Sequence, residues 1–99
     1  MITECYTYIL QGQKDFFYCG ITKDIHIRYC QHNTGKSNST KNYLPYSIKF
    51  LKRFSTRSLA HQLEVTIKNT GVKKWYDKNI LFGNYPNMVI THLISGKKT

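Results

Sequence analysis

Three segments of the chain carry the apolar and aromatic patterns of β-strands. Residues 5–10 (CYTYIL) and 16–21 (FFYCGI) are rich in β-forming residues, and the polar segment 11–15 between them is typical of a hairpin loop. Residues 47–54 (SIKFLKRF) alternate apolar and basic side chains, as in a strand with one solvated face. The pattern therefore predicts a β-hairpin followed, later in the chain, by a third strand.

A helix is predicted between the hairpin and the third strand. Thr22 or Asp24 can cap it, and it would extend over about 25–33. Within it, Arg28 and His32 are four residues apart, so both side chains point to the same side of the helix.

A second helix is predicted after the third strand. Candidate caps lie within 55–58, and the helix would end near Thr70, just before Gly71. Its apolar stripe at helical spacing consists of Leu59, Ala60, Leu63 and Ile67. Residues 72–78 predict a third, short helix.

The order β-β-α-β-α-α predicts a small α/β domain of the α+β type, with helices flanking a mostly antiparallel three-stranded sheet. The polar segment 34–46 is expected to be a loop, and the apolar run 88–94 is compatible with one more strand. Since no repeat or long linker divides the chain, we expect residues 1–99 to form a single domain. Its C-terminal part, 72–99, has no assigned role.

The charge of the chain favours a polyanionic partner. Fifteen Lys and Arg residues stand against five Asp and Glu residues, which gives a formal net charge of +10. Nucleic acid is the leading candidate, an anionic membrane surface is the second, and the alternative is a merely soluble basic protein.

The cysteines and the apolar segments indicate an intracellular, cytoplasmic protein. Cys5, Cys19 and Cys30 are odd in number and match no zinc-binding spacing, which fits a reducing compartment. No signal peptide is visible at the N-terminus, and no segment approaches the roughly 20 apolar residues of a membrane span.

One acidic residue stands out because it interrupts an apolar stripe. Glu64 falls one turn after Ala60 in the second predicted helix. A carboxylate left without a partner there would be costly to bury. We therefore expect a positive group beside it: an arginine, a lysine or a metal ion.

Tyr8 in the first predicted hairpin strand and Tyr18 and Gly20 in the second form a pattern that resembles the two motifs of the GIY-YIG nuclease family. Tyr8, in the segment Thr-Tyr-Ile-Leu, takes the place of the first motif tyrosine. Tyr18 and Gly20 match the second motif, in which Cys19 replaces the isoleucine. The resemblance covers roughly residues 5–68, and its specificity comes from the ordered set rather than from any one residue.

The predicted helices continue this resemblance. Arg28 lies at the position of the family's catalytic arginine, and His32 follows one turn later. Thr40 and Pro45 stand where small single-domain members and Slx-type catalytic domains carry similar residues. Glu64 matches the family's metal-binding glutamate.

The resemblance implies a metal-dependent endonuclease. Glu64 would hold Mg²⁺ or Mn²⁺, since one carboxylate can anchor such an ion while water and phosphate complete its shell. Arg28 would fork onto phosphate oxygens. Tyr8 would act as general base or position the water, with Tyr18 and His32 supporting it. Whether Tyr8 or His32 takes the proton stays open.

The implied substrate is DNA. Little of the chain is left for base readout, so recognition of branched or flapped DNA in repair or recombination is more plausible than strong sequence specificity. A nonspecific or single-strand nuclease is the alternative within the class. The side chains expected to contact nucleic acid are Asn33, Lys36, Thr40, Lys41, Lys49 and Arg53.

Each of these residues also has a purely structural explanation. The tyrosines are ordinary strand residues, and Glu64 can pair with Lys68, four residues on. Trp75 and Tyr76 can pack on the sheet or offer a stacking surface to a base. The competing functions are a nucleic-acid-binding module that does not cut and a basic protein that binds other acidic partners.

Overall fold

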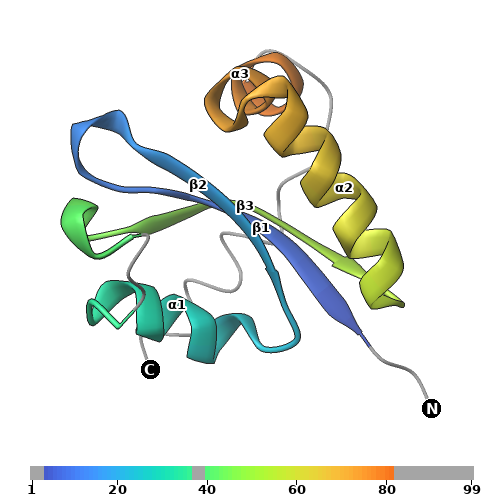
Figure 1. The fold of residues 1–99 in the computed structure, drawn as a ribbon, viewed down its shortest axis with the longest axis horizontal. Helices are drawn as coiled ribbons and strands as arrows, with labels where there is room; N and C mark the ends of the chain where they lie inside the picture. The colour runs from blue at the N-terminus through green and yellow to red at the C-terminus, as the bar shows by residue number, and fades with distance from the viewer. Residues whose placement is uncertain (1–3, 37–39, 82–99) are drawn as a thin grey trace.

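The sheet has three antiparallel strands, with the first strand in its centre. A computed structural model of the chain describes residues 4–36 and 40–81. The strands are β1 (Cys5–Gln11), β2 (Phe17–Thr22) and β3 (Ser47–Phe54), in the order β2-β1-β3 (Figure 1). β1 pairs with both neighbours, so that Tyr8 lies between Gly20 on β2 and Leu51 on β3.

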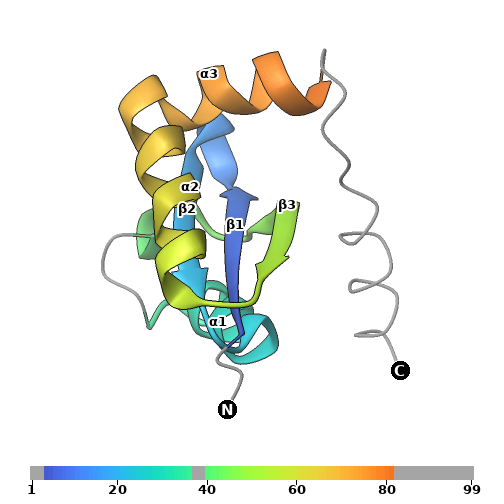
Figure 2. The same ribbon diagram turned by 90° about the vertical axis from the view of Figure 1, so that its right-hand side faces the viewer.

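Helices cover both faces of this sheet. α1 (Ile25–Asn33) lies on one face, and α2 (Arg57–Thr70) and α3 (Val72–Tyr76) lie on the other, where the chain turns sharply between them (Figures 1 and 2). Short 3-10 helices over Gln13–Asp15 and Lys41–Tyr43 and a π-helical turn over Asp77–Leu81 complete the described elements. The predicted α+β class and the order of its elements are confirmed.

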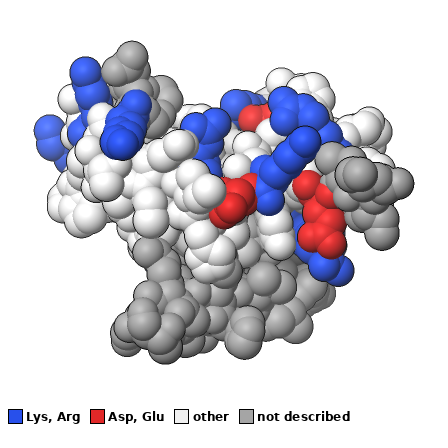
Figure 3. Space-filling model, turned by 90° about the horizontal axis from the view of Figure 1, so that it is seen from below, with Lys and Arg blue, Asp and Glu red and all other residues white. Residues whose placement is uncertain are grey.

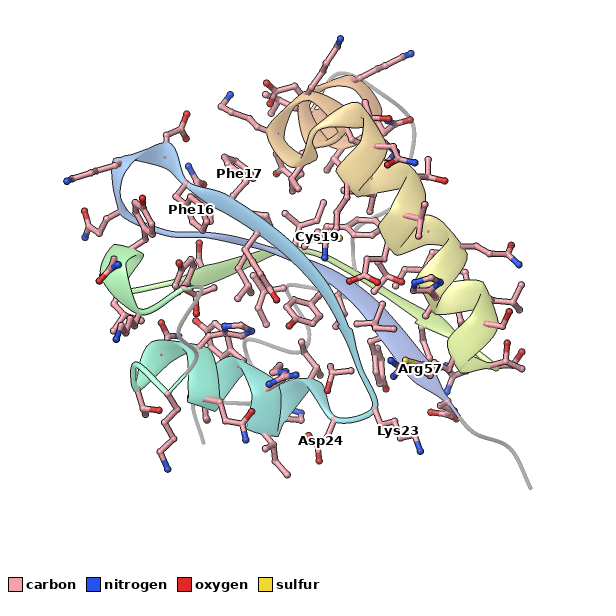
Figure 4. All side chains as sticks on the ribbon, viewed as in Figure 1. Phe16, Phe17, Cys19, Lys23, Asp24 and Arg57 are labelled. Atoms are coloured by element: carbon pink, nitrogen blue, oxygen red, sulfur yellow. The ribbon has the colours of Figure 1, made fainter. Side chains whose placement is uncertain are left out.

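The capping residues explain where the two longer helices begin. Asp24 accepts a hydrogen bond from the Ile27 amide at the start of α1, where Figure 4 shows it, and Thr56 accepts one from the Leu59 amide at the start of α2. α2 ends at Gly71, whose φ of 100° suits a residue without a side chain. The possible strand over 88–94 lies outside the described residues.

The two faces of β1 pack on different helices. Its alternating side chains place Cys5, Thr7 and Ile9 toward α2, where the buried Thr7 hydroxyl donates to the Ala60 carbonyl at 2.8 Å. Tyr8, on the opposite face, points toward α1. Since β1 is buried on both faces, it forms the centre of the core.

The outer helices complete the core, with one correction to the expected pattern. Ala60 and Ile67 of the predicted α2 stripe are buried, but Leu59 is 43% exposed because it lies at the margin of the stripe. Trp75 is buried edge-on against Phe50, with ring centroids 5.3 Å apart. The packing role of Trp75 is therefore the one that the structure supports.

The loop after α1 is tied to that helix through Asn33. The Tyr46 amide donates to the Asn33 side-chain oxygen at 2.6 Å, and the Asn33 amide group donates back to the Tyr46 carbonyl at 3.2 Å. Tyr29 also donates to that carbonyl, at 2.7 Å. The expected nucleic-acid contact of Asn33 is thus replaced by a structural role, because both ends of its amide are engaged by the backbone.

Replacing Asn33 with alanine is expected to lower the free energy of unfolding by about 1–3 kcal/mol, because the Tyr46 amide would lose its acceptor in a part-buried place. Chemical denaturation followed by circular dichroism measures this change. The exposed Asn69 of α2 supplies a control, since its replacement by alanine should change stability by less than about 0.5 kcal/mol. Equal effects at the two positions would contradict the role given to Asn33.

Candidate active site

The centre of the candidate site is a buried hydrogen-bonded chain of three side chains. The Tyr8 hydroxyl lies 3.0 Å from His32 Nε2, and His32 Nδ1 lies 2.8 Å from the Thr40 hydroxyl. Tyr8, His32 and Thr40 come from β1, α1 and the loop after α1, and each is at most 1% exposed. Residues far apart in the sequence therefore fix one imidazole ring from both sides.

Burial keeps the imidazole neutral. Desolvation, helped by the charge of Arg28, lowers the pKa of His32 from 6.5 to about 4. A neutral imidazole has one donor nitrogen and one acceptor nitrogen. Among the described side chains, His32 is the hydrogen-bond partner seen for the Tyr8 hydroxyl, so we assign Tyr8 as donor to Nε2 and Nδ1–H as donor to Thr40.

Tyr8 itself is held in its neutral form. Burial, and after it the neighbouring Tyr18, raise the pKa of Tyr8 above its ordinary value, although the charge of Arg28 works in the opposite direction. A tyrosine of this kind donates a hydrogen bond more readily than it exists as a tyrosinate. The Tyr8–His32 pair can accept a proton only if the imidazole receives one.

Gly20 allows Tyr8 to occupy its place. A Cβ atom at Gly20 would lie 2.6 Å from the Tyr8 hydroxyl and 3.2 Å from the Tyr18 ring. Such contacts are too short for any side chain, so the glycine of the second motif is required by the close approach of the two tyrosines. Packing around the Tyr8 phenol thus explains why a glycine stands at position 20.

Tyr18 connects the buried chain to the surface. It is half-buried on the edge strand β2, with its ring centroid 5.1 Å from that of His32 and 6.3 Å from that of Tyr8. Among the described strands, β2 pairs with β1 alone, so no described strand lies on its other edge. The hydroxyl-bearing rings therefore gather beside an edge of the sheet that a ligand can approach.

Arg28 lies one helical turn before His32 on α1. It is exposed, and its Nη1 donates to Gln31 Oε1 at 3.1 Å. Its charge affects the pKa values of both Tyr8 and His32, which places the guanidinium near the buried chain. Gln31 was not among the predicted site residues, although its i,i+3 spacing from Arg28 was a visible signal.

Glu64 reaches the site from α2, on the other side of the sheet. Its side chain is 15% exposed, and Lys68 Nζ lies 3.1 Å from Oε2. The same ammonium lies 6.0 Å from the centroid of the Tyr18 ring, so the carboxylate and the tyrosines belong to one cluster. The positive group expected beside Glu64 is thus Lys68, with His61 Nε2 more distant, at 4.0 Å from Oε1.

The thiol of Cys19 lies beneath this ion pair. Figure 4 shows Cys19 and Phe17 on the side of β2 that faces α2 and α3. Burial, and then the charge of Glu64, raise the pKa of the Cys19 thiol to about 12, so it stays protonated. The residue that replaces the motif isoleucine therefore acts as a small core side chain.

A hard divalent cation would have the single carboxylate of Glu64 as its anchor at this cluster. Within residues 4–36 and 40–81, no three His, Cys, Asp or Glu side chains come together in a way that could hold a metal ion. Mg²⁺ needs no such cage, because it keeps several waters and binds through one or two carboxylates together with substrate phosphate. The Lys68 ammonium already pairs with the Glu64 carboxylate. Glu64 therefore accepts a positive group at this position.

The predicted nucleic-acid contacts do not form one surface with this cluster. Thr40 is corrected to a structural residue, because it is fully buried and its hydroxyl binds His32. Lys49 and Arg53 lie on β3, the edge of the sheet opposite Tyr18, and Arg53 pairs with Glu4 at 3.2 Å. Figure 3 shows the Lys and Arg side chains of one face in separate groups rather than in one continuous patch.

Three of the predicted basic contacts are exposed. Lys36 and Lys41 lie between α1 and β3, and Arg53 lies on β3. Figure 3 also shows acidic side chains beside one group of basic ones. In the part of the chain that the structure describes, no helix has the length and apolar character needed to cross a membrane.

The low pKa of His32 predicts a pH dependence of stability. Between pH 4 and pH 6.5 the unfolded chain binds a proton at this residue and the folded protein does not, so stability falls as the pH is lowered through that window. One pKa unit corresponds to about 1.4 kcal/mol, which gives a contribution of about 3 kcal/mol. Denaturation across this pH range should show a steeper slope for the wild type than for His32→Gln. Parallel slopes for the two proteins would contradict a neutral, buried imidazole.

Comparison with known proteins identifies the family of this fold. The model of the GIY-YIG catalytic domain matches residues 4–78. The UPF0213 protein YsiG of Lactococcus lactis is 34% identical over 74 residues, which cover 74% of this chain and 71% of that protein. A UPF0213 protein of Vibrio campbellii is 32% identical over 69 residues, covering 68% and 66%.

Another UPF0213 relative and a solved UPF0213 structure are also similar to this chain. A UPF0213 protein of Photorhabdus laumondii is 37% identical over 62 residues, which cover 62% of this chain and 60% of that protein. The matched part of the chain thus spans between 60% and 71% of the length of these three relatives. The solution NMR structure of a UPF0213 protein from Bacillus halodurans superimposes with a TM-score of 0.52 at 26% identity, covering 82% of this chain and 87% of that one. The chain therefore belongs to the GIY-YIG catalytic domain family.

Proposed function

We propose that this protein is an endonuclease that hydrolyses phosphodiester bonds in DNA with the help of a divalent cation. The observation that carries the proposal is the convergence of Tyr18, Arg28 and Glu64, from three different elements, around the buried Tyr8–His32 pair. Phosphodiester hydrolysis needs a water that can lose a proton, positive charge on the phosphate and stabilisation of the leaving oxygen.

The Tyr8–His32 pair supplies the proton acceptor in this mechanism. As the attacking water loses its proton to the Tyr8 oxygen, the hydroxyl proton of Tyr8 moves to His32 Nε2, so that the tyrosine remains neutral. The half-buried Tyr18 hydroxyl holds the water or the phosphate beside it. Thr40 keeps the imidazole in the tautomer that leaves Nε2 free to accept, since its hydroxyl oxygen accepts the hydrogen bond from Nδ1–H.

Arg28 and Glu64 act on the phosphate from opposite sides. The Arg28 guanidinium, oriented by Gln31, is suited to two non-bridging phosphate oxygens at once. Glu64 would hold Mg²⁺ or Mn²⁺, and the bound ion would supply charge neutralisation at the phosphate and the leaving oxygen. The buried thiol of Cys19 takes no part in the reaction.

Several features favour recognition of DNA shape over base sequence. The net charge of +10 supports binding to phosphates, and on the face seen in Figure 3 the described Lys and Arg side chains lie in separate groups. Branched or flapped DNA, which offers backbones in several directions, fits such a distribution, and a role in repair or recombination follows from that choice of substrate. Lys36 and Lys41 are the accessible contacts on the side of α1.

Glu64→Gln is expected to abolish cleavage while leaving DNA binding within about twofold, because the amide cannot hold a divalent cation as the carboxylate does. The assay compares linear, flapped, branched and single-stranded DNA with Mg²⁺, with Mn²⁺ and with chelator. Tyr8→Phe should lower the rate by about 10²-fold or more, since it removes the hydroxyl that passes the proton. Binding without metal-dependent cleavage by the wild type would leave a non-cutting binding module as the function.

Gly20→Ala is expected to lower the cleavage rate by about 10-fold or more, because the added Cβ meets the Tyr8 hydroxyl and moves it from His32. Circular dichroism should show that the variant still folds. Gly35→Ala makes a useful control: its φ of 79° disfavours a side chain, but the nearest atom to an added Cβ is 3.7 Å away and belongs to Leu44. A Gly20→Ala enzyme of wild-type rate would refute the tight packing around Tyr8.

A further inference from the structure

The ion pair on α2 has a geometry that holds without any ligand. Glu64 and Lys68 are four residues apart, with the acidic residue nearer the N-terminus, which is the favourable order for such a pair. Lys68 Nζ lies 3.1 Å from Glu64 Oε2. The helix itself therefore places a cation on the carboxylate proposed to hold the metal ion.

The two side chains of this ion pair differ in their exposure to solvent. The Glu64 side chain is 15% exposed and the Lys68 side chain is 49% exposed. The carboxylate is thus held in the site, whereas the ammonium is carried by a flexible stem of four carbons that reaches solvent. Of the two groups, Lys68 is the one that can leave.

The ammonium also lies near an aromatic ring of the cluster. Lys68 Nζ lies 6.0 Å from the centroid of the Tyr18 ring, near the limit of a cation–π contact. His61, the other basic group beside the carboxylate in the part of the chain described, is 60% exposed and lies 4.0 Å away. Lys68 is therefore the main cation on Glu64, and it lies between the carboxylate and the Tyr18 ring.

An ammonium and a divalent cation compete for the same carboxylate. Mg²⁺ binds oxygen at about 2.0–2.1 Å, so an ion on Glu64 would be within a few ångströms of the ammonium in its present position. Like charges at such a distance repel each other strongly even near the protein surface. A divalent cation can take full hold of Glu64 only when the ammonium moves away.

We propose that Lys68 is an exchangeable counter-cation of Glu64, which holds the carboxylate in the metal-free protein and yields it to the divalent cation. Lys68 is a positioning residue, because it acts through Glu64. The inference rests on the proposed function in that it assumes a metal ion on Glu64. Its consequence is that the protein binds the ion more weakly than the bare carboxylate would.

Binding of Mn²⁺ in the absence of DNA tests this directly, because the electron paramagnetic resonance signal of free Mn²⁺ reports the bound fraction without any cleavage. Lys68→Met should lower the Kd for Mn²⁺ by a factor of about 3 to 10, the size expected for losing one nearby, partly exposed positive charge. Lys68→Arg should bind Mn²⁺ as weakly as the wild type. Lys74→Met, which removes the same charge from an exposed position on α3, should leave the Kd unchanged.

Other outcomes overturn the inference. An unchanged or raised Kd in Lys68→Met would show that the ammonium does not compete with the ion, and an equal gain in Lys74→Met would show a general effect of net charge. If Glu64→Gln binds Mn²⁺ as the wild type does, no ion lies on Glu64 and the exchange fails with it. Failure of the nuclease proposal is recognised separately, by the absence of metal-dependent DNA cleavage.

Discussion

The hydrogen bond between Tyr8 and His32 is the interaction on which the arrangement of the site depends. It joins the central strand β1 to α1 across the core, and it requires a neutral imidazole because the ring is buried. Thr40 fixes the ring from the loop, and Gly20 leaves room for the phenol. The motif residues of two strands and one helix therefore serve first to form a single buried hydrogen bond. Any chemical role that they have depends on that packing.

This contact also divides the site into an inner and an outer part. The inner part, Tyr8 and His32, is dry and uncharged, because burial raises the pKa of the phenol and lowers the pKa of the imidazole. The outer part, with Tyr18, Arg28 and Glu64, borders the edge strand β2 and is at least partly exposed. In the proposed mechanism, the phosphate meets the outer groups while a proton passes to the inner pair.

Local patterns in the sequence predicted most of the fold and the motif residues of the site. The hairpin, the bounds of α1 at 25–33 and the caps Asp24 and Thr56 depend on neighbours within a few residues, so they could be predicted directly. The roles of Thr40 and Asn33 could not, because each partner lies across a loop, 8 and 13 residues away. In the sequence, a polar residue of this loop has the same appearance whether its side chain faces solvent or binds a buried ring.

Glu64 shows how a local and a functional explanation can both hold. Its spacing from Lys68 predicts an ordinary helix ion pair, and the structure contains that pair. The same lysine nevertheless lies beside Tyr18, so the pair is part of the cluster rather than an isolated feature of the surface. A carboxylate proposed to bind a metal ion can be held, in the absence of that ion, by a partly exposed partner from its own helix. The ion pair in the structure is thus compatible with the proposed metal site and would limit the strength with which that site binds.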